Sequence, residues 1–282
     1  MAKAKVLAAM AALLLTAPLW TCAQDQTPGN AAQGNATQNN PAQDDAAQKN
    51  ADKARAALDA MVKALGGQAW LDMKNQLLQG QIAAFFQGRP DEGTTLVYEY
   101  HAWPDDDRIE VTKHRDVHEF FVGRKGWEVT YRGKKALPQD QVDDYLRRRD
   151  HSIETAVKVW LKNPNTILVY EGQHLAERHL AEQVTLISPE NEGITILMDA
   201  QTHLPLQRVF QYRDPIYHDK NTDTEEYDNY HLVDGIQTPY AITRLKNGDT
   251  VRQFYIKQVK YNQPLSSDFW DPDEAAHHVA KK

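Results

Sequence analysis

Two series of alternating apolar and polar residues, separated by one helical segment, constrain the fold of this chain more than any other feature. The segments comprise residues 78–86, 94–103, 108–113, 118–122, 126–131, 167–171, 182–188, 193–199, 206–212, 225–233, 238–245 and 251–261. Alternation with a period of two predicts strands with one buried face. Short joins such as Asn247-Gly248-Asp249 favour antiparallel hairpins over helical crossovers.

Two helical segments accompany these strands. The first carries an apolar stripe that stops at Gly66-Gly67, where a glycine can adopt the left-handed cap; the stripe consists of Ala54, Leu58, Met61, Val62 and Leu65. The second, residues 138–162, has apolar residues spaced for one or two helices and ends at Asn163-Pro164. The pattern is typical of an α+β protein with an N-terminal helix and a central helical lid.

A long antiparallel sheet has to curl, and its open edges favour a barrel or half-barrel. We therefore expect one domain over residues 49–282. Its sheet is predicted to be strongly curved, an unclosed β-barrel of about 11 strands. The helices are expected to close the concave side.

The N-terminus carries the features of an export signal over residues 1–23. Lys3 and Lys5 precede an apolar run, Val6–Trp20, that is too short to span a bilayer comfortably. Thr21-Cys22-Ala23 predicts cleavage before Gln24. The alternative is that Cys22 becomes a lipid-modified N-terminus that anchors the protein to the outer membrane. Both alternatives predict an exported, periplasmic protein without a transmembrane segment after cleavage.

Residues 24–48 are nearly all Gln, Asn, Ala, Gly and Asp, with no aromatic side chain. Such a stretch has too little apolar surface to offset its ordering entropy, so it is predicted to be a disordered linker. It is either a tolerated low-complexity tail or a tether that holds the domain away from a membrane.

Composition excludes whole classes of protein. A mean hydropathy of -0.66 and 41% hydrophobic residues argue against a polytopic membrane protein. Lys and Arg number 32 against 39 Asp and Glu, and removal of Lys3 and Lys5 with the signal increases the acidic excess. Nucleic acid is therefore not an expected partner. The single cysteine, Cys22, excludes an intrachain disulfide framework and a cysteine-rich zinc site.

Enzymatic signatures are weak. His114, Asp116 and His118 have ligand-like spacing but resemble a turn between strands. Asp105-Asp106-Asp107 lacks the glycine of a calcium loop and is expected to be a hairpin turn. His277-His278 is expected to be a solvated tail. No nucleophile elbow, zinc-binding helix or phosphate loop is present in the sequence. We predict no catalytic residue, metal or cofactor, and keep a periplasmic hydrolase or metal enzyme as the third interpretation.

Short motifs spread over residues 50–272 resemble the LolA/LolB-like outer-membrane lipoprotein-sorting proteins. They are Ala64-Leu65-Gly66-Gly67, Gly126-Trp127, Met198-Asp199-Ala200-Gln201-Thr202-His203-Leu204-Pro205, Val233-Asp234-Gly235-Ile236-Gln237-Thr238-Pro239 and a closing segment, residues 262–269. The resemblance implies an unclosed antiparallel barrel, lined with apolar side chains and lidded by helices, that binds acyl chains or other amphiphiles without catalysis.

A carrier of this kind needs a large, dry concavity, because exposing a roughly 16-carbon chain to water costs on the order of 12 kcal/mol. The candidates for an apolar lining are Phe86, Tyr98, Tyr100, Phe121, Trp127, Val129, Trp160, Met198, Phe210 and Ile256. Each is alternatively an ordinary core residue. Arg208 shares a strand face with Leu206 and Phe210. It is expected either to hold a head group or a lid carboxylate, or to point into water at a strand end.

These features predict an exported periplasmic binding protein for a hydrophobic or amphiphilic ligand. The resemblance points to outer-membrane lipid or lipoprotein handling, with a lipid, an acyl chain or a lipoprotein as partner. The alternative is a protein–protein interaction or stress-sensor module of the cell envelope that uses the same fold.

Overall fold

The computed structural model describes residues 41–91, 93–176 and 179–279, all within one compact unit, Asn40–Lys282. The predicted signal peptide, Cys22 and most of the predicted linker lie outside the described residues. Within the described part, no helix is both long and apolar enough to cross a membrane.

In the described part of the chain, the strands form one 14-stranded antiparallel sheet. The first series is β1 (Asn75–Phe86), β2 (Arg89–Pro90), β3 (Thr95–Ala102), β4 (Asp106–Val111), β5 (Val117–Val122), β6 (Lys125–Thr130) and β7 (Gly133–Ala136). The second is β8 (Ile167–Ala176), β9 (His179–Ile187), β10 (Gly193–Asp199), β11 (Pro205–Arg213), β12 (Lys220–Val233), β13 (Ile236–Lys246) and β14 (Asp249–Tyr261).

The helical elements complete the fold. They are α1 (Pro41–Leu65), α2 (Gln68–Leu71), α3 (Gln139–Asp150), α4 (Ile153–Lys158), the 3₁₀ turns η1 (Trp160–Lys162) and η2 (Ser267–Trp270), and α5 (Pro272–Val279). The predicted curved sheet, N-terminal helix and central helical lid are confirmed. The number of strands exceeds the prediction because β2 and β7 follow tight turns that the sequence pattern marks only as turns.

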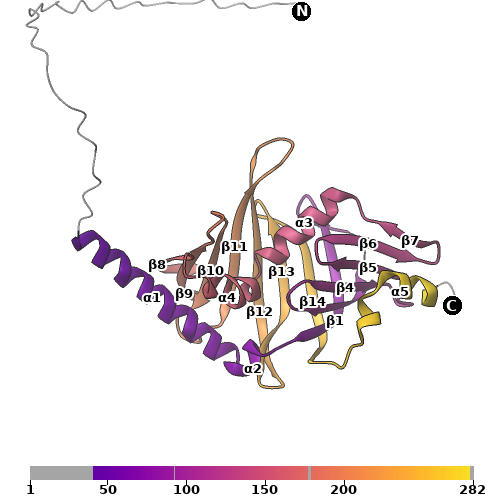
Figure 1. Ribbon diagram of the computed structural model, residues 1–282, viewed down its shortest axis with the longest axis horizontal. Helices are drawn as coiled ribbons and strands as arrows, with labels where there is room; N and C mark the ends of the chain where they lie inside the picture. The colour runs from indigo at the N-terminus through magenta and orange to yellow at the C-terminus, as the bar shows by residue number, and fades with distance from the viewer. Residues whose placement is uncertain (1–40, 92, 177–178, 280–282) are drawn as a thin grey trace, which may run out of the picture. The chain divides into compact units, whose positions relative to one another are not determined.

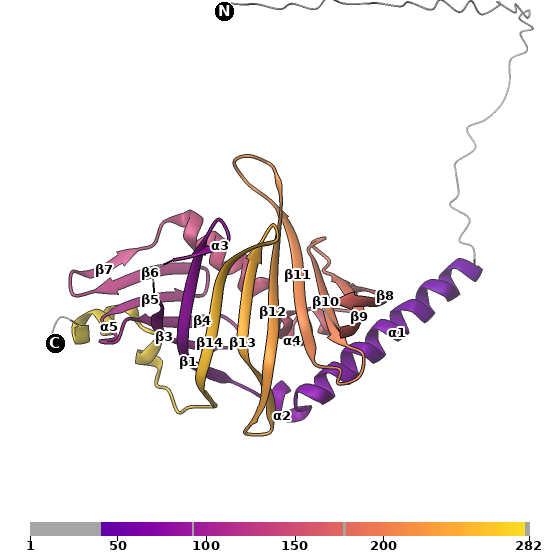
Figure 2. The same cartoon turned by 180° about the vertical axis from the view of Figure 1, so that it is seen from behind.

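The order of the strands explains why a lid exists. Apart from β2, the order is β7-β6-β5-β4-β3-β1-β14-β13-β12-β11-β10-β9-β8. The chain therefore reaches one edge of the sheet at β7 and resumes at the opposite edge with β8. Helices α3 and α4 carry it across the concave face (Figures 1 and 2). Residues of α3 and of the sheet consequently line the same cavity.

Helix α1 begins at Pro41, so the prediction of disorder up to residue 48 is wrong for the end of that range. Alanine and glutamine are good helix formers, and proline is favoured in the first turn. Asp44 also lies in the first turn, where the helix dipole stabilises a negative charge. The C-terminal end is as predicted, because Gly67 has φ +58° and its N–H donates to the Val62 carbonyl at 2.8 Å.

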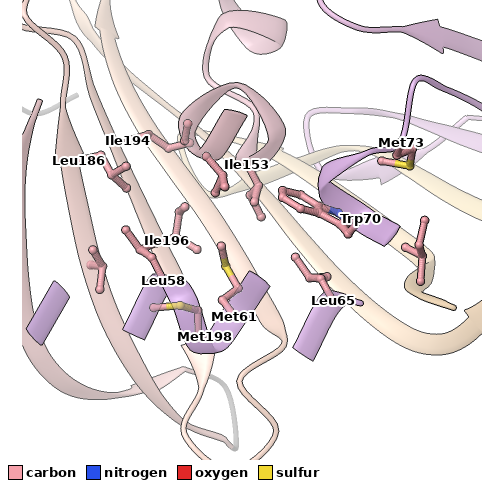
Figure 3. Close-up of a cluster of buried hydrophobic side chains, with 14 of the residues drawn as sticks. Leu58, Met61, Leu65, Trp70, Met73, Ile153, Leu186, Ile194, Ile196 and Met198 are labelled. Atoms are coloured by element: carbon pink, nitrogen blue, oxygen red, sulfur yellow. The ribbon is translucent and has the colours of Figure 1, made fainter. Parts of the chain in front are cut away.

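The main hydrophobic core attaches α1 and α4 to the sheet. Leu58 and Met61 of α1 are fully buried with Ile196 and Met198 of β10 (Figure 3). Trp70 of α2 and Ile153 of α4 extend this cluster toward β1. Burial of each large apolar side chain stabilises the fold by roughly 1.5–3 kcal/mol, so this end of the concave face is closed by packed side chains.

A second, smaller cluster lies on the opposite face of the sheet. Phe120 of β5 and Val129 of β6 are fully buried against Ala275 and Val279 of α5. His277 and His278 are solvent-exposed, as expected, but they lie within α5 and not in a tail. Helix α3 therefore packs on one face of β5 and β6, through Phe121 and Gly126, and α5 packs on the other face, over Phe120 and Val129.

Gly80 of β1 provides a test of the packing between β1 and β14. A Cβ atom there would lie 2.2 Å from the backbone oxygen of Tyr255 and 2.8 Å from the Cα of Ile256. We expect Gly80→Ala to lower the free energy of unfolding by roughly 2–3 kcal/mol, because backbone atoms have to move. Gly193→Ala in β10, where no heavy atom lies within 4 Å, is the control and is expected to change it by less than about 0.5 kcal/mol. Equal urea midpoints for the two variants would contradict the register shift at Gly80.

Candidate functional site

Two adjoining cavities lie between the concave face of the sheet and the helices. The larger, about 620 Å³, extends from β1, β3, β4 and β5 to α3. The smaller, about 160 Å³, lies between α2, α4 and strands β12–β14. They share five lining residues: Gln76, Leu78, Ser152, Glu154 and Glu225. The combined space is within the size range of small-molecule sites in proteins.

The sheet side of the larger cavity is apolar. Leu78 of β1, Val97 of β3, Ile109 and Val111 of β4 and Phe121 of β5 line it. These residues occupy alternate positions on their strands, which places their side chains on one face. Phe121 stacks on Tyr145 of α3 with ring centroids 3.6 Å apart, so an aromatic contact joins the sheet to the lid.

The remaining wall of the larger cavity is charged. Each arginine that lines it forms an ion pair with a carboxylate that also lines it. These pairs are Arg148 with Asp144, Arg149 with Asp107 at 3.1 Å, Arg208 with Glu225 at 3.2 Å, and Arg252 with Glu99. The expected dry, apolar-lined concavity therefore describes the sheet side alone, and the cavity as a whole is amphiphilic.

Arg208 of β11 anchors this charged wall. Its side chain is 2% exposed and contacts Asp223 at 3.5 Å and Glu225 at 3.2 Å, both on the neighbouring strand β12. Burial by itself disfavours the cation, but the nearby Glu225, Tyr227 and Asp223 outweigh it, and the pKa of Arg208 is raised. The prediction that Arg208 points into water at a strand end is wrong. Its partners are carboxylates of the sheet, not of the lid.

The ion pairs continue from the sheet to the lid. Arg244 of β13 contacts Asp223 at 2.8 Å and Asp144 of α3 at 3.7 Å. Burial opposes ionisation of Asp144, yet the pKa of this carboxyl is lowered because Arg148, Arg244 and Arg147 surround it. The lid is thus held to the sheet by a chain of alternating charges as well as by the Phe121–Tyr145 stack.

A second buried link involves His101, Asp107 and Arg149. Asp107 is 3% exposed; its carboxylate contacts the Nδ1 atom of His101 and accepts a hydrogen bond from Arg149 Nη1. Arg149 also donates to the backbone oxygens of Asp105 and Gly123. The expectation that Asp105-Asp106-Asp107 is a hairpin turn is wrong for Asp106 and Asp107, which begin β4.

Two carboxylates of the site have no ion pair among the described residues, Glu119 of β5 and Glu154 of α4. Burial raises the pKa of Glu119, and nearby Glu128 and Glu99 raise it further. Glu154 lies in the first turn of α4, where the helix dipole favours a carboxylate. Within the described residues, no group of three or more His, Cys, Asp or Glu is arranged to hold a metal ion.

The structure brings some of the predicted lining residues to the cavities. Phe121, Tyr100 and Arg208 line the larger cavity, and Ile256 of β14 lines the smaller. The Tyr100 ring nevertheless packs against Phe269 of η2, with centroids 4.8 Å apart. The remaining candidates line neither cavity.

Three of these other candidates are buried or partly buried core residues on the concave side. Met198 belongs to the main core under α1, and Trp160 of η1 packs against its edge. Phe210 of β11 stacks on His151 with centroids 4.4 Å apart. For these three residues the alternative interpretation, that each is an ordinary core residue, fits the structure.

Four candidates were assigned to the wrong place. Phe86 is 70% exposed at the end of β1. Trp127 and Val129 of β6 pack in the cluster under α5, while Gly126 faces the lid, where a Cβ would lie 2.7 Å from Val142. Tyr98 of β3 faces away from the cavity and carries the Arg115 guanidinium 4.6 Å above its ring. The alternation at Trp127 and Val129 is as predicted, but their face of β6 is the one that α5 covers and not the concave one.

The structure also places residues in the site that the sequence did not single out. Two of these residues are strand carboxylates. Glu99 lies on the same face of β3 as Val97, and Glu119 lies on the same face of β5 as Phe121. Their alternation with these apolar residues was the sequence signal that could have predicted them as cavity residues. Trp70 of α2 and Tyr227, Tyr230 and Tyr261 of the last strands line the smaller cavity, and no sequence signal connects them.

Comparison with known proteins identifies the fold. No protein-family model matches this sequence, and no curated protein does. A DUF1329 family protein from Desulfovibrio piger superposes with a TM-score of 0.53 at 12% identity, over 77% of this chain and 97% of that one. A putative outer membrane lipoprotein-sorting protein domain from Vibrio parahaemolyticus gives 0.50 at 9% identity, over 80% and 99%.

A LolA superfamily protein from Nitrosomonas europaea is also similar, with a TM-score of 0.48 at 12% identity over 77% of this chain and 97% of that one. At such identities the likeness concerns the fold alone, and it rests on the first two structures. The LolA-like fold that the sequence motifs predicted is confirmed.

Proposed function

We propose that this protein is an exported, non-catalytic binding protein for amphiphilic molecules of the bacterial envelope. The observation that carries the proposal is the two-sided cavity between the sheet and the lid. One side consists of apolar strand residues such as Val97 and Val111, and the other consists of ion pairs such as Arg208–Glu225. An amphiphile has the same division between a chain and a polar group.

The energetics favour such a ligand over a bare hydrocarbon. Covering about ten methylenes against the apolar floor is worth roughly 8 kcal/mol. A chain that also lay against the charged wall would strip water from ionic groups without replacing their hydrogen bonds, which is costly. A polar group placed against that wall avoids this cost. The ligand class therefore includes lipids and acylated peptides. The structural similarity to a putative lipoprotein-sorting domain supports lipoprotein handling as a specific case.

Export is part of the proposal and rests on the leader. Lys3, Lys5 and the apolar run that follows have the layout of a secretory signal. Periplasmic exposure would bring the cavity next to membrane lipids.

Native mass spectrometry tests the binding function. The mature chain, purified from envelope-containing cells, is expected to carry a lipid-sized adduct or to take up an added lipopeptide. Thr95→Trp is expected to weaken uptake about tenfold, because Thr95 is exposed and lines the larger cavity, so an indole there occupies ligand space.

Thr94→Trp is the matched control, since Thr94 is exposed and is not among the lining residues of either cavity. Its uptake is expected to equal that of the wild type. An apo mass together with no uptake of lipopeptide or labelled fatty acid would refute carriage and leave protein recognition as the better function.

Intact-mass analysis of the secreted chain tests the leader. A mass that begins at Gln24 is expected, because Ala23 is a suitable residue before the cleavage point. A chain that begins at Cys22 with the added mass of acyl groups would show instead that the protein is a membrane-anchored lipoprotein.

A further inference from the structure

The smaller cavity combines aromatic walls with negative charge. Trp70, Tyr227, Tyr230 and Tyr261 line it, together with the carboxylates of Glu154 and Glu225. The described residues that line it include no lysine, arginine or histidine. Aromatic faces and an acidic side chain are the combination that recognises alkylammonium groups.

The aromatic walls are fixed in place before any ligand binds. The hydroxyl of Tyr230 donates to the Pro205 carbonyl at 2.7 Å, and that of Tyr261 bonds to Thr238 Oγ1 at 2.6 Å. Tyr227 donates to Glu225 at 3.1 Å. Burial, followed by the charge of Glu154, raises the pKa of Tyr230 well above its usual value, so the ring stays neutral. Rigid neutral rings limit the ordering cost of binding.

Only one of the two carboxylates is available to a ligand. Glu225 is ion-paired with Arg208, whereas Glu154 has no hydrogen bond and no ion pair among the described residues. Its position in the first turn of α4 stabilises the charge but does not neutralise it. Glu154 lines both cavities, so it stands where the polar end of a ligand would meet its chain.

The protein already places one ammonium group against Trp70, one of these aromatic residues. Nζ of Lys158 lies 5.1 Å from the ring centroid of Trp70 and 4.3 Å from that of Trp103, and it donates to the Met73 carbonyl at 3.2 Å. Burial lowers the pKa of Lys158, while Glu154 opposes this shift. No ion pair joins this resident cation to Glu154, and Lys158 is not among the described residues that line the smaller cavity.

We propose that the smaller cavity binds the alkylammonium group of an amphiphile, with Glu154 as its counter-charge and the four aromatic residues as its walls. The chain of the ligand then extends over Leu78 along the apolar floor of the larger cavity, past Val97 and Ile109, and does not lie against the ion-paired wall. This inference rests on the proposed amphiphile binding and specifies the ligand's charge.

The test compares three detergents with the same dodecyl chain, each below the concentration at which it forms micelles. They are the trimethylammonium, maltoside and sulfate derivatives, titrated calorimetrically into the mature chain. The ammonium compound is expected to bind at least about tenfold more tightly than the other two. Glu154→Gln is expected to remove this preference, so that the ammonium and maltoside compounds bind with similar affinity.

Glu119→Gln is the matched control, because Glu119 is also an unpaired carboxylate but lines only the larger cavity. It is expected to keep the preference. Melting temperatures of both variants show whether they fold, and Gln keeps the size of the side chain. Equal affinity for all three detergents, tightest binding of the sulfate, or a preference that survives Glu154→Gln would overturn the ammonium site while leaving amphiphile binding intact. Failure of all three to bind would instead refute the proposed function.

Discussion

The pairing of β1 with β14 is the contact on which the rest of the fold depends. It joins two local hairpin series into one sheet. Gln76 pairs with Tyr261, although the two residues lie near opposite ends of the folded chain in sequence. Without it, each series would be a separate meander with two open edges. Because the chain starts in the middle of the sheet and returns there, its central segment has to connect opposite edges. Helices α3 and α4 make this connection over the concave face, so the lid follows from the topology.

The same topology brings the charges together. Asp144 and Arg148 come from the connecting helix, Arg208 and Asp223 from the second strand series, and Glu99 from the first. Buried ion pairs rarely add stability over well-packed apolar residues, because desolvation cancels most of the attraction. Apolar side chains at these positions would fill the space and remove the cavity. The charged network is better understood as a wall that keeps the space open and polar on one side.

The sequence predicted the architecture well because strand alternation and turn residues are local signals. Both strand series, the lid and the cap at Gly66-Gly67 were found in this way. The cavity lining was predicted poorly because it depends on which helix packs on each face of the sheet, and strand alternation does not contain this information. Helix α5 is short, and a pattern that does not include it places the Trp127 side chain on the concave face. The structure places Trp127 under α5 on the other face. Glu99 was overlooked because a charged residue in an inward phase contradicts the usual pattern of burial.

The edge strand β8 shows how the N-terminal helix protects the open side of the sheet. The side-chain amide of Asn50 donates to the Tyr170 carbonyl at 2.8 Å, and its oxygen accepts from the Tyr170 N–H at 2.8 Å. One asparagine thus reproduces both hydrogen bonds of a neighbouring strand. Exposed edge groups promote pairing with other chains, and this bidentate contact blocks them at Tyr170. Helix α1 therefore closes the hydrophobic core through Leu58 and Met61 and also covers an edge of the sheet.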